Sequence, residues 1–188
     1  MPAVKIVHFS DVLCVWAYVG QANLDRLIAE HGDRIDVEVR FCSVFPDTNT
    51  KLQAAWRDRG GFEGYAEHVR GVADQFSQGP VHQDVWSKVR PRSSASPHML
   101  LKAIELIEDA TTTTERPSIL AAKELRNAFF VEARDIANWN VQRTICERIG
   151  MDFDVVLKKV ETGEALAALA ADYQLSQSLA VQGLSLIH

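Results

Sequence analysis

Apolar and polar positions along the first 48 residues predict a strand, a helix and a second strand. Residues 4–9 (VKIVHF) are short, rich in β-branched side chains and nearly continuous in apolar character, which is typical of a strand covered on both faces. From Trp16 to His31 apolar side chains recur at helical spacing, and Gly32 supplies a stop. Residues 35–41 alternate between apolar and charged, the period of a half-buried strand. This order predicts a right-handed crossover unit with two parallel strands.

After Pro46 the pattern is helical almost to the end of the chain. Residues 47–76 predict a polar loop and then one or two helices, broken at a pair of glycines. Within residues 93–110, Ser96 is the expected N-cap of a helix and Pro97 its first residue. Further helices are expected over residues 116–134, 140–150, 152–163 and 164–180. The chain is therefore expected to be α/β at its ends and all-helical in its middle.

Composition narrows the class of protein. A chain of 188 residues, 47% hydrophobic and 24% charged, can form one well-packed domain or a small domain with an insertion. No apolar run of about 18 residues exists to span a membrane, and residues 1–11 lack the features of a secretory signal, so we expect a cytoplasmic protein. The net charge of −5, with basic residues spread among acidic ones, argues against a nucleic-acid partner.

The three cysteines do not form a recognisable metal or disulfide pattern. Cys14, Cys42 and Cys146 are odd in number and widely spaced, and none of the histidines shows metal-ligand spacing. In a reducing cytosol these cysteines are expected to be thiols, and no metal is expected. For Cys42 and Cys146 plain burial in the core is the favoured interpretation.

Cys14 is the candidate nucleophile because it directly precedes the first predicted helix. Unpaired N–H groups and the positive end of the helix dipole favour a thiolate there. Ala17 stands where a dithiol redox enzyme would carry its second cysteine. The resolving thiol would then be external, such as glutathione, or would be Cys42, which ends the neighbouring strand. The enzymatic interpretation depends on a sulfur that reaches water and is ionised at neutral pH.

Residues 9–20 (FSDVLCVWAYVG) resemble the opening of the DsbA-like oxidoreductases of the FrnE and 2-hydroxychromene-2-carboxylate isomerase group. The positions that match the family pattern are Ser10, Asp11, Cys14, Trp16 and Tyr18. Val15 replaces the family's proline, and Ala17 replaces its second cysteine. Looser matches are residues 93–103, with His98 near the start of a helix, residues 125–138 and residues 172–183.

The resemblance implies a thioredoxin-like fold with a large all-helical insertion. Residues 1–48 would form the first half of the thioredoxin-like domain, residues 49–150 the helical insertion, and residues 151–188 the return helix. In the relatives, the position of Gly183 is followed by a proline loop and further strands, whereas here the chain reads LSLIH and stops. We therefore expect a chain truncated at its C-terminus, with the last five residues an artefact. As written, it would expose an unpaired strand edge and be poorly soluble.

The resemblance also implies a function. Cys14 would be the nucleophile of a thiol-disulfide oxidoreductase, with no tightly bound cofactor, with glutathione as co-substrate and with a thiol or disulfide substrate. The residues expected to contact substrate or co-thiol are Asp11, Trp16, Ala17, Tyr18, Cys42 and His98. Two alternative functions stay open: a glutathione-dependent isomerase or transferase, and a non-catalytic binding protein of the same fold. Assembly as a homodimer also stays open. Each candidate also has a structural interpretation, because Asp11 can satisfy the turn, His98 can pack or cap, and Trp16 and Tyr18 can belong to the core.

Overall fold

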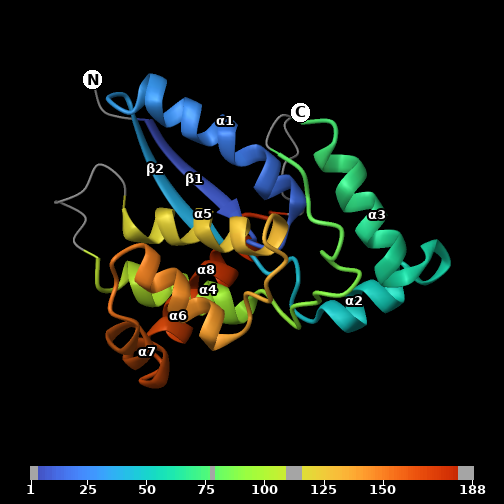
Figure 1. Cartoon of the computed structure of the whole chain (residues 1–188). Coiled ribbons are helices and arrows are strands. Elements are labelled where there is room, and N and C mark those ends of the chain that lie inside the picture. The colour runs from blue at the N-terminus through green and yellow to red at the C-terminus, as the bar shows by residue number, and fades with distance from the viewer. Residues whose placement is uncertain (1–3, 77–78, 109–115, 182–188) are drawn as a thin grey trace.

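The computed structural model of the chain describes residues 4–76, 79–108 and 116–181. Figure 1 shows a pair of strands beside α1, with the remaining helices gathered below them and to one side. In the described part of the chain, no helix combines the length and the apolar character needed to cross a bilayer. The last five residues, which we expect to be an artefact, and the position after Gly183 where the relatives have a proline loop lie outside the described residues.

The predicted crossover unit is confirmed. Strand β1 (Val4–Ser10) leads into helix α1 (Val15–His31) and then strand β2 (Ile35–Phe41). The strands are parallel, in a register that runs from Val4 opposite Ile35 to Ser10 opposite Phe41. Within the described residues the sheet contains these two strands only. Their carboxyl ends, where residues 10–14 and 41–45 lie, therefore meet at one edge of the sheet.

Helices make up most of the remaining chain, as predicted. They are α2 (Thr48–Ala55), a short 3-10 helix η1 (Arg57–Arg59), α3 (Gly61–Ala73), α4 (Ala95–Glu105), α5 (Pro117–Phe130), α6 (Trp139–Arg148), α7 (Phe153–Glu161) and α8 (Glu164–Ser178). The predicted break at the glycine pair is confirmed, because η1 ends before Gly60 and α3 begins after it. Gly60 has a φ of 86°, a left-handed conformation that costs glycine little. The N-cap of α4 is Ser94 and not Ser96, so Pro97 lies two residues further into the helix than predicted.

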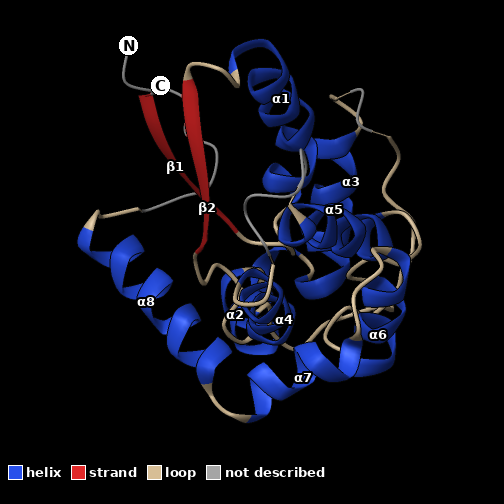
Figure 2. Ribbon diagram, turned by 90° about the vertical axis from the view of Figure 1, so that its left-hand side faces the viewer, coloured by secondary structure: helices blue, strands red, loops and turns tan. Residues whose placement is uncertain are grey.

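The strand pair is covered by different helices on its two faces. Figure 2 shows α1 and α5 on one side of the strands and α8 on the other. Asp172 on α8 is fully buried and accepts hydrogen bonds from Arg40 Nη1 at 2.7 Å and from the Phe41 N–H at 3.1 Å. Lys102 on α4 completes this buried ion cluster at 3.2 Å from Asp172. A buried carboxylate compensated by two cations thus joins α8 to the sheet and to α4.

One continuous hydrophobic core runs through the helical region and reaches the strand pair. Trp86 has no exposed surface; its ring stacks on Phe45 and meets Phe129 edge-on, with centroids 5.4 and 5.1 Å apart. Because this core includes both Val12 and Ala165, it crosses the predicted boundaries at residues 48 and 150. The division into a thioredoxin-like domain and an insertion stays a prediction.

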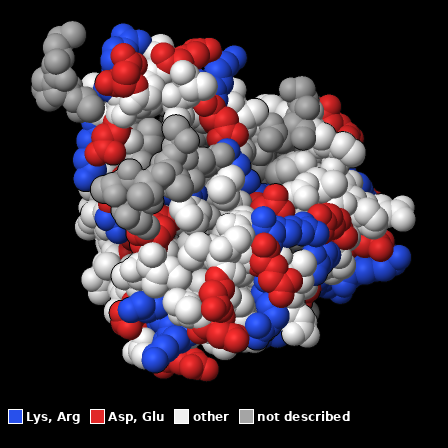
Figure 3. Space-filling view, turned by 60° about the vertical axis from the view of Figure 1, so that its left-hand side comes forward, with Lys and Arg blue, Asp and Glu red and all other residues white. Residues whose placement is uncertain are grey.

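Charges of both signs share the molecular surface that Figure 3 shows, with lysine and arginine side chains next to aspartate and glutamate. Ion pairs of the described chain include Lys5 with Glu38 at 2.9 Å and Lys159 with Glu164 at 2.7 Å. The prediction that the protein has no nucleic-acid partner stays a prediction.

The helical core should dominate stability. Leu125 on α5 is fully buried, and we expect Leu125→Ala to lower the free energy of unfolding by about 2–5 kcal/mol, through lost burial and the cavity left behind. Leu166 on α8 is 57% exposed, and Leu166→Ala should change the free energy of unfolding by less than about 0.5 kcal/mol. Urea denaturation followed by circular dichroism measures both. Equal losses for the two variants would contradict this assignment of the core.

Candidate functional site

The turn between β1 and α1 places Cys14 at the N-cap of α1, at the carboxyl edge of the sheet. Its N–H donates to the Asp11 carbonyl oxygen at 3.1 Å, and its own carbonyl oxygen accepts the Tyr18 N–H at 3.1 Å. The Asp11 side chain also accepts the Leu13 N–H through Oδ1 at 2.9 Å, an Asx turn that shapes this connection. The sequence therefore places Cys14 correctly at the start of the helix.

Asp11 fixes this turn to two distant segments. Its carboxylate is fully buried, and Oδ2 accepts the Val44 and Phe45 N–H groups at 3.0 and 3.2 Å. Oδ2 also accepts the hydroxyl of Ser94, the N-cap residue of α4, at 2.8 Å. Asp11 therefore has a structural role that extends beyond its own turn. Its carboxylate joins the Cys14 turn, the loop after β2 and the start of α4.

The ionisation expected of Cys14 is wrong for this structure. The side chain is 6% exposed. Burial raises the pKa of the Cys14 thiol above its ordinary value, and the Asp11 carboxylate adds to the rise. The backbone N–H groups of Ala17 and Trp16, and the Lys51 ammonium, lower the pKa but do not offset burial. The helix N-terminus acts in the predicted direction, and desolvation outweighs it.

Cys42 lies beside this turn, as the parallel strands predicted. It directly follows β2; its N–H donates to the Ser10 carbonyl oxygen at 3.0 Å and its Sγ approaches the same oxygen at 3.6 Å. Burial, together with the negative charges of Asp11 and an ionised Cys14, raises the pKa of Cys42 to about 12. Cys14, Cys42 and Cys146 are all free thiols. Cys146 is fully buried in the helical core, as favoured from the sequence.

His98 packs against the turn before α1 and accepts one of its N–H groups. Its imidazole is fully buried and stacks on Phe41 at 4.8 Å between ring centroids. Nε2 accepts the Val12 N–H at 3.3 Å, so the ring proton is assigned to Nδ1, which lies 3.3 Å from Tyr173 Oη. Burial lowers the pKa of His98, so the ring is neutral at physiological pH. The geometry agrees with the packing interpretation of His98.

The two aromatic residues near Cys14 differ in burial: Trp16 is partly exposed and Tyr18 lies in the core. Trp16 is 37% exposed and meets Phe76, which follows α3, edge-on at 6.1 Å between ring centroids. Tyr18 is buried and stacks on Phe130 of α5 at 4.6 Å. Ala17 is partly buried and packs against the core. Of the expected contact residues near Cys14, Trp16 therefore offers the largest exposed surface.

Lys51 is a residue of the site that sequence analysis missed. It lies on α2; its Nζ donates to the Val44 carbonyl oxygen and sits 4.4 Å from the centroid of the Phe45 ring. Burial lowers the pKa of Lys51, while the negative charges of Asp11 and an ionised Cys14 raise it. No local pattern links Lys51 to Cys14; only the loop after β2 brings α2 to the turn. Among the residues that the structure describes, no group of three His, Cys, Asp or Glu side chains is arranged to hold a metal.

Most of this chain matches a known protein family. A family model described as a DSBA-like thioredoxin domain matches residues 5–184. One curated relative, the ClpXP adapter protein SpxH of Halalkalibacterium halodurans, is 24% identical over an alignment 183 residues long that covers 94% of this chain and 55% of that protein. The chain thus spans about half the length of the curated relative it matches.

Solved structures with low sequence identity share the fold. A Nitrosomonas europaea protein provisionally named a protein disulfide isomerase has a TM-score of 0.78 at 14% identity, over 96% of this chain and 81% of its own. The cytosolic disulfide reductase DsbM of Pseudomonas aeruginosa, solved with GSH, has a TM-score of 0.67 at 19% identity, over 96% and 83%. A 2-hydroxychromene-2-carboxylate isomerase has a TM-score of 0.52 at 12% identity, over 92% and 79%. The thioredoxin-like, helix-rich fold expected from the sequence is confirmed.

The Asp11 carboxylate should stabilise the whole site. Asp11→Asn removes a buried charge that accepts several hydrogen bonds, and we expect it to lower the free energy of unfolding by about 1.5–3 kcal/mol, the range for a hydrogen bond to a charged group. Asp36 is exposed on β2, and Asp36→Asn should change the same quantity by less than about 0.5 kcal/mol. Urea denaturation at neutral pH compares them. An Asp11→Asn variant as stable as the parent would show that this carboxylate does not hold the segments together.

Proposed function

Because the chain belongs to the family of DSBA-like thioredoxin domains, we propose that it is a thiol-disulfide oxidoreductase in which Cys14 is the attacking sulfur. The observation that carries this proposal is the position of Cys14 as N-cap of α1, on a turn fixed by Asp11 at the carboxyl edge of the parallel strands. The helix amides of Trp16 and Ala17 favour the anion of this sulfur, but burial raises its pKa overall, so the thiolate that reacts is a minor species at neutral pH. The proposed location is the cytoplasm.

The proposed reaction uses one protein sulfur. The Cys14 thiolate attacks one sulfur of a glutathione mixed disulfide; a Cys14–glutathione disulfide forms, and the other sulfur leaves as a thiolate. A glutathione thiolate then attacks the glutathione sulfur of this adduct, which releases oxidised glutathione and returns Cys14 as a thiolate. The substrate disulfide is reduced to a thiol, and two glutathione molecules end as one disulfide. The electrons come from glutathione.

Glutathione is proposed as co-thiol because the chain provides no good internal one. Ala17 occupies the place of the usual resolving cysteine. Cys42, with its pKa at about 12, carries almost no thiolate at neutral pH. DsbM, a neighbour in fold, was solved with GSH, which supports the same chemistry here. Exposed Trp16, paired with Phe76, is proposed to contact the substrate beside the reactive sulfur.

Burial of Cys14 favours a second candidate function, a non-catalytic binding protein of the same fold. A sulfur that is 6% exposed and has a raised pKa is a poor nucleophile at neutral pH. The curated relative SpxH is named as an adapter protein, a role based on binding. An isomerase or transferase that uses glutathione is a third candidate, supported by the likeness in fold to 2-hydroxychromene-2-carboxylate isomerase. Formation of a homodimer stays a prediction.

Exposure to oxidised glutathione distinguishes the first two candidates. We expect one glutathione adduct, located by mass spectrometry of peptides on Cys14, because Cys14 alone combines the helix N-terminus with a nearby cation. Cys14→Ser should abolish the adduct, and Cys146→Ser, which changes a fully buried core cysteine, should retain it. A disulfide between Cys14 and Cys42 would replace the one-sulfur mechanism with an internal one. Absence of any adduct even at pH 9 would favour the binding protein.

The pH dependence tests the ionisation of Cys14. Its raised pKa means that the thiolate fraction is small at neutral pH and grows about tenfold per pH unit until the pKa is reached. We expect the rate of Cys14 alkylation by iodoacetamide, followed by peptide mass spectrometry, to rise about tenfold per unit between pH 7 and 9. Free glutathione in the same reaction should level off at a lower pH. A rate for Cys14 that is already constant below pH 8 would contradict the raised pKa.

A further inference from the structure

Lys51 is a partly exposed cation beside the Cys14 turn. Its Nζ donates to the Val44 carbonyl oxygen and lies 4.4 Å from the centroid of the Phe45 ring. The N–H groups of the same two residues donate to the Asp11 carboxylate. The Asp11 carbonyl oxygen in turn accepts the Cys14 N–H at 3.1 Å. A short series of contacts therefore links the ammonium to the turn that carries the proposed reactive sulfur.

The ammonium of Lys51 keeps donors for a ligand. A protonated lysine has three N–H donors, and the Val44 carbonyl oxygen accepts one of them. The carboxylate of Asp47, which caps the same helix, pairs with Arg92 at 3.0 Å. Among the residues that the structure describes, no other acceptor bonds to Lys51 Nζ. Two N–H groups are therefore left for solvent or for an acceptor on a bound molecule.

The Asp11 carboxylate offsets part of the charge of Lys51 but is closed to a ligand. Burial lowers the pKa of Lys51, and the negative charge of Asp11 acts against this change. Asp11 is fully buried, and its oxygens accept hydrogen bonds from Leu13, Val44, Phe45 and Ser94. A molecule that approaches from solvent therefore meets the ammonium and not the carboxylate.

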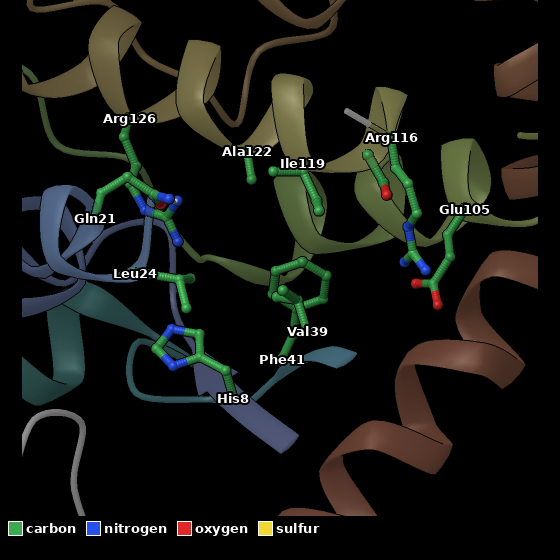
Figure 4. Close-up of a pocket in the computed structure, with 11 residues that line it drawn as sticks. His8, Gln21, Leu24, Val39, Phe41, Glu105, Arg116, Ile119, Ala122 and Arg126 are labelled. Carbon is green, nitrogen blue, oxygen red and sulfur yellow. Dashed lines mark hydrogen bonds between the residues drawn. The ribbon is translucent and has the colours of Figure 1, made fainter. Parts of the chain in front are cut away.

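Arg126, another cation close to the turn, is closed off as well. The residue is 4% exposed, and its guanidinium donates to Gln21 Oε1 and Ser10 Oγ, both at 2.7 Å. Figure 4 shows Arg126 beside Gln21 at one end of a cavity between the strand pair, α1 and α5. The cavity offers about 20 Å³ to the centres of water-sized molecules, little more than the 10–15 Å³ that a single water needs. A substrate anion therefore has access to Lys51 and not to Arg126.

We propose that Lys51 selects disulfides that carry a carboxylate close to the sulfur that Cys14 attacks, over neutral and cationic disulfides. The inference rests on the proposed function, because it names the substrate class of the same reaction. The remaining N–H groups bind the carboxylate through charge-assisted hydrogen bonds and hold the attacked sulfur beside Cys14. The Cys14 thiolate forms the new sulfur–sulfur bond, the other sulfur leaves as a thiolate, and Lys51 keeps its proton. Glutathione, the proposed co-thiol, carries carboxylates and belongs to this class.

Alkylation with a matched pair of reagents tests the charge selection apart from redox chemistry. Iodoacetate and iodoacetamide both alkylate a thiolate with loss of iodide, and they differ in charge. We expect the ratio of their rates at Cys14, iodoacetate over iodoacetamide, to exceed the ratio for mercaptoethanol about fivefold, the effect of two unit charges about 4 Å apart in water. Salt at about 1 M should remove this excess, because the screening length falls to about 3 Å. A ratio equal to that of mercaptoethanol would overturn the proposal.

Variants of Lys51 locate the selection. Lys51→Gln should lower the ratio about fivefold, to the value for mercaptoethanol, and Lys51→Arg should retain it, because a unit charge stays in place. Both reagents need the thiolate, so a change in the Cys14 pKa cancels in the ratio, and a merely structural role of Lys51 would not move it. Lys158→Gln, at an exposed position of α7, should leave the ratio unchanged. Circular dichroism checks each fold. A ratio that stays high in Lys51→Gln would refute the role of Lys51.

A charge series of disulfides separates this proposal from the proposed function. Mass spectrometry of Cys14 adducts should show the fastest reaction with dithiodipropionate, an anion, a slower one with neutral bis(hydroxyethyl) disulfide and the slowest with cystamine, a cation, each relative to the same disulfide with mercaptoethanol. Equal relative rates would overturn the charge selection and leave the oxidoreductase function. No adduct with any of the three would refute the oxidoreductase function, and the alkylation ratio would still decide whether Lys51 attracts anions to Cys14.

Discussion

The buried carboxylate of Asp11 is the constraint on which the site depends. Its two oxygens accept hydrogen bonds from the turn before α1, from the loop after β2 and from the hydroxyl of Ser94, the N-cap residue of α4. Three segments that are distant in sequence meet at one group, and each would leave a buried donor unsatisfied if it moved away. The geometry of the Cys14 turn, the placement of Lys51 and the junction between strands and helices all follow from this arrangement.

At Cys14 two physical effects of known sign compete. The end of a helix contributes about 0.3–1 kcal/mol, and up to about 2 kcal/mol in partly buried geometries, in favour of the anion. Burial of an ionisable group shifts its pKa by up to about 3–5 units, and each unit is about 1.4 kcal/mol. Desolvation can therefore exceed the helix contribution, which is the outcome for this sulfur. Position at a helix N-terminus therefore does not by itself ionise a cysteine at neutral pH.

The protein buries a charged side chain on each face of the strand pair, Asp172 on one and Arg126 on the other. The cost of taking each charge out of water is offset in a different way. Asp172 has two cations and a backbone N–H around it, so its burial is compensated within the protein. The hydrogen-bond partners of Arg126 are neutral, the amide oxygen of Gln21 and the hydroxyl of Ser10, and the negative charges of Asp11 and Asp25 also favour its charged form. Direct ion pairs thus compensate Asp172, whereas neutral hydrogen-bond partners and carboxylates without an ion pair stabilise Arg126.

The sequence by itself determined the crossover unit, the helical content and the place of Cys14 before α1, because periodicity and helix-end signals are local. It did not indicate the N-cap of α4 at Ser94, because that hydroxyl donates to Asp11, 83 residues away in the chain. Only the tertiary structure decided that Cys14 is buried, that Lys51 lies near it, that His98 is neutral and that Arg126 is buried with neutral hydrogen-bond partners. Burial and charge compensation depend on which distant segments pack together, and a linear pattern carries no measure of either.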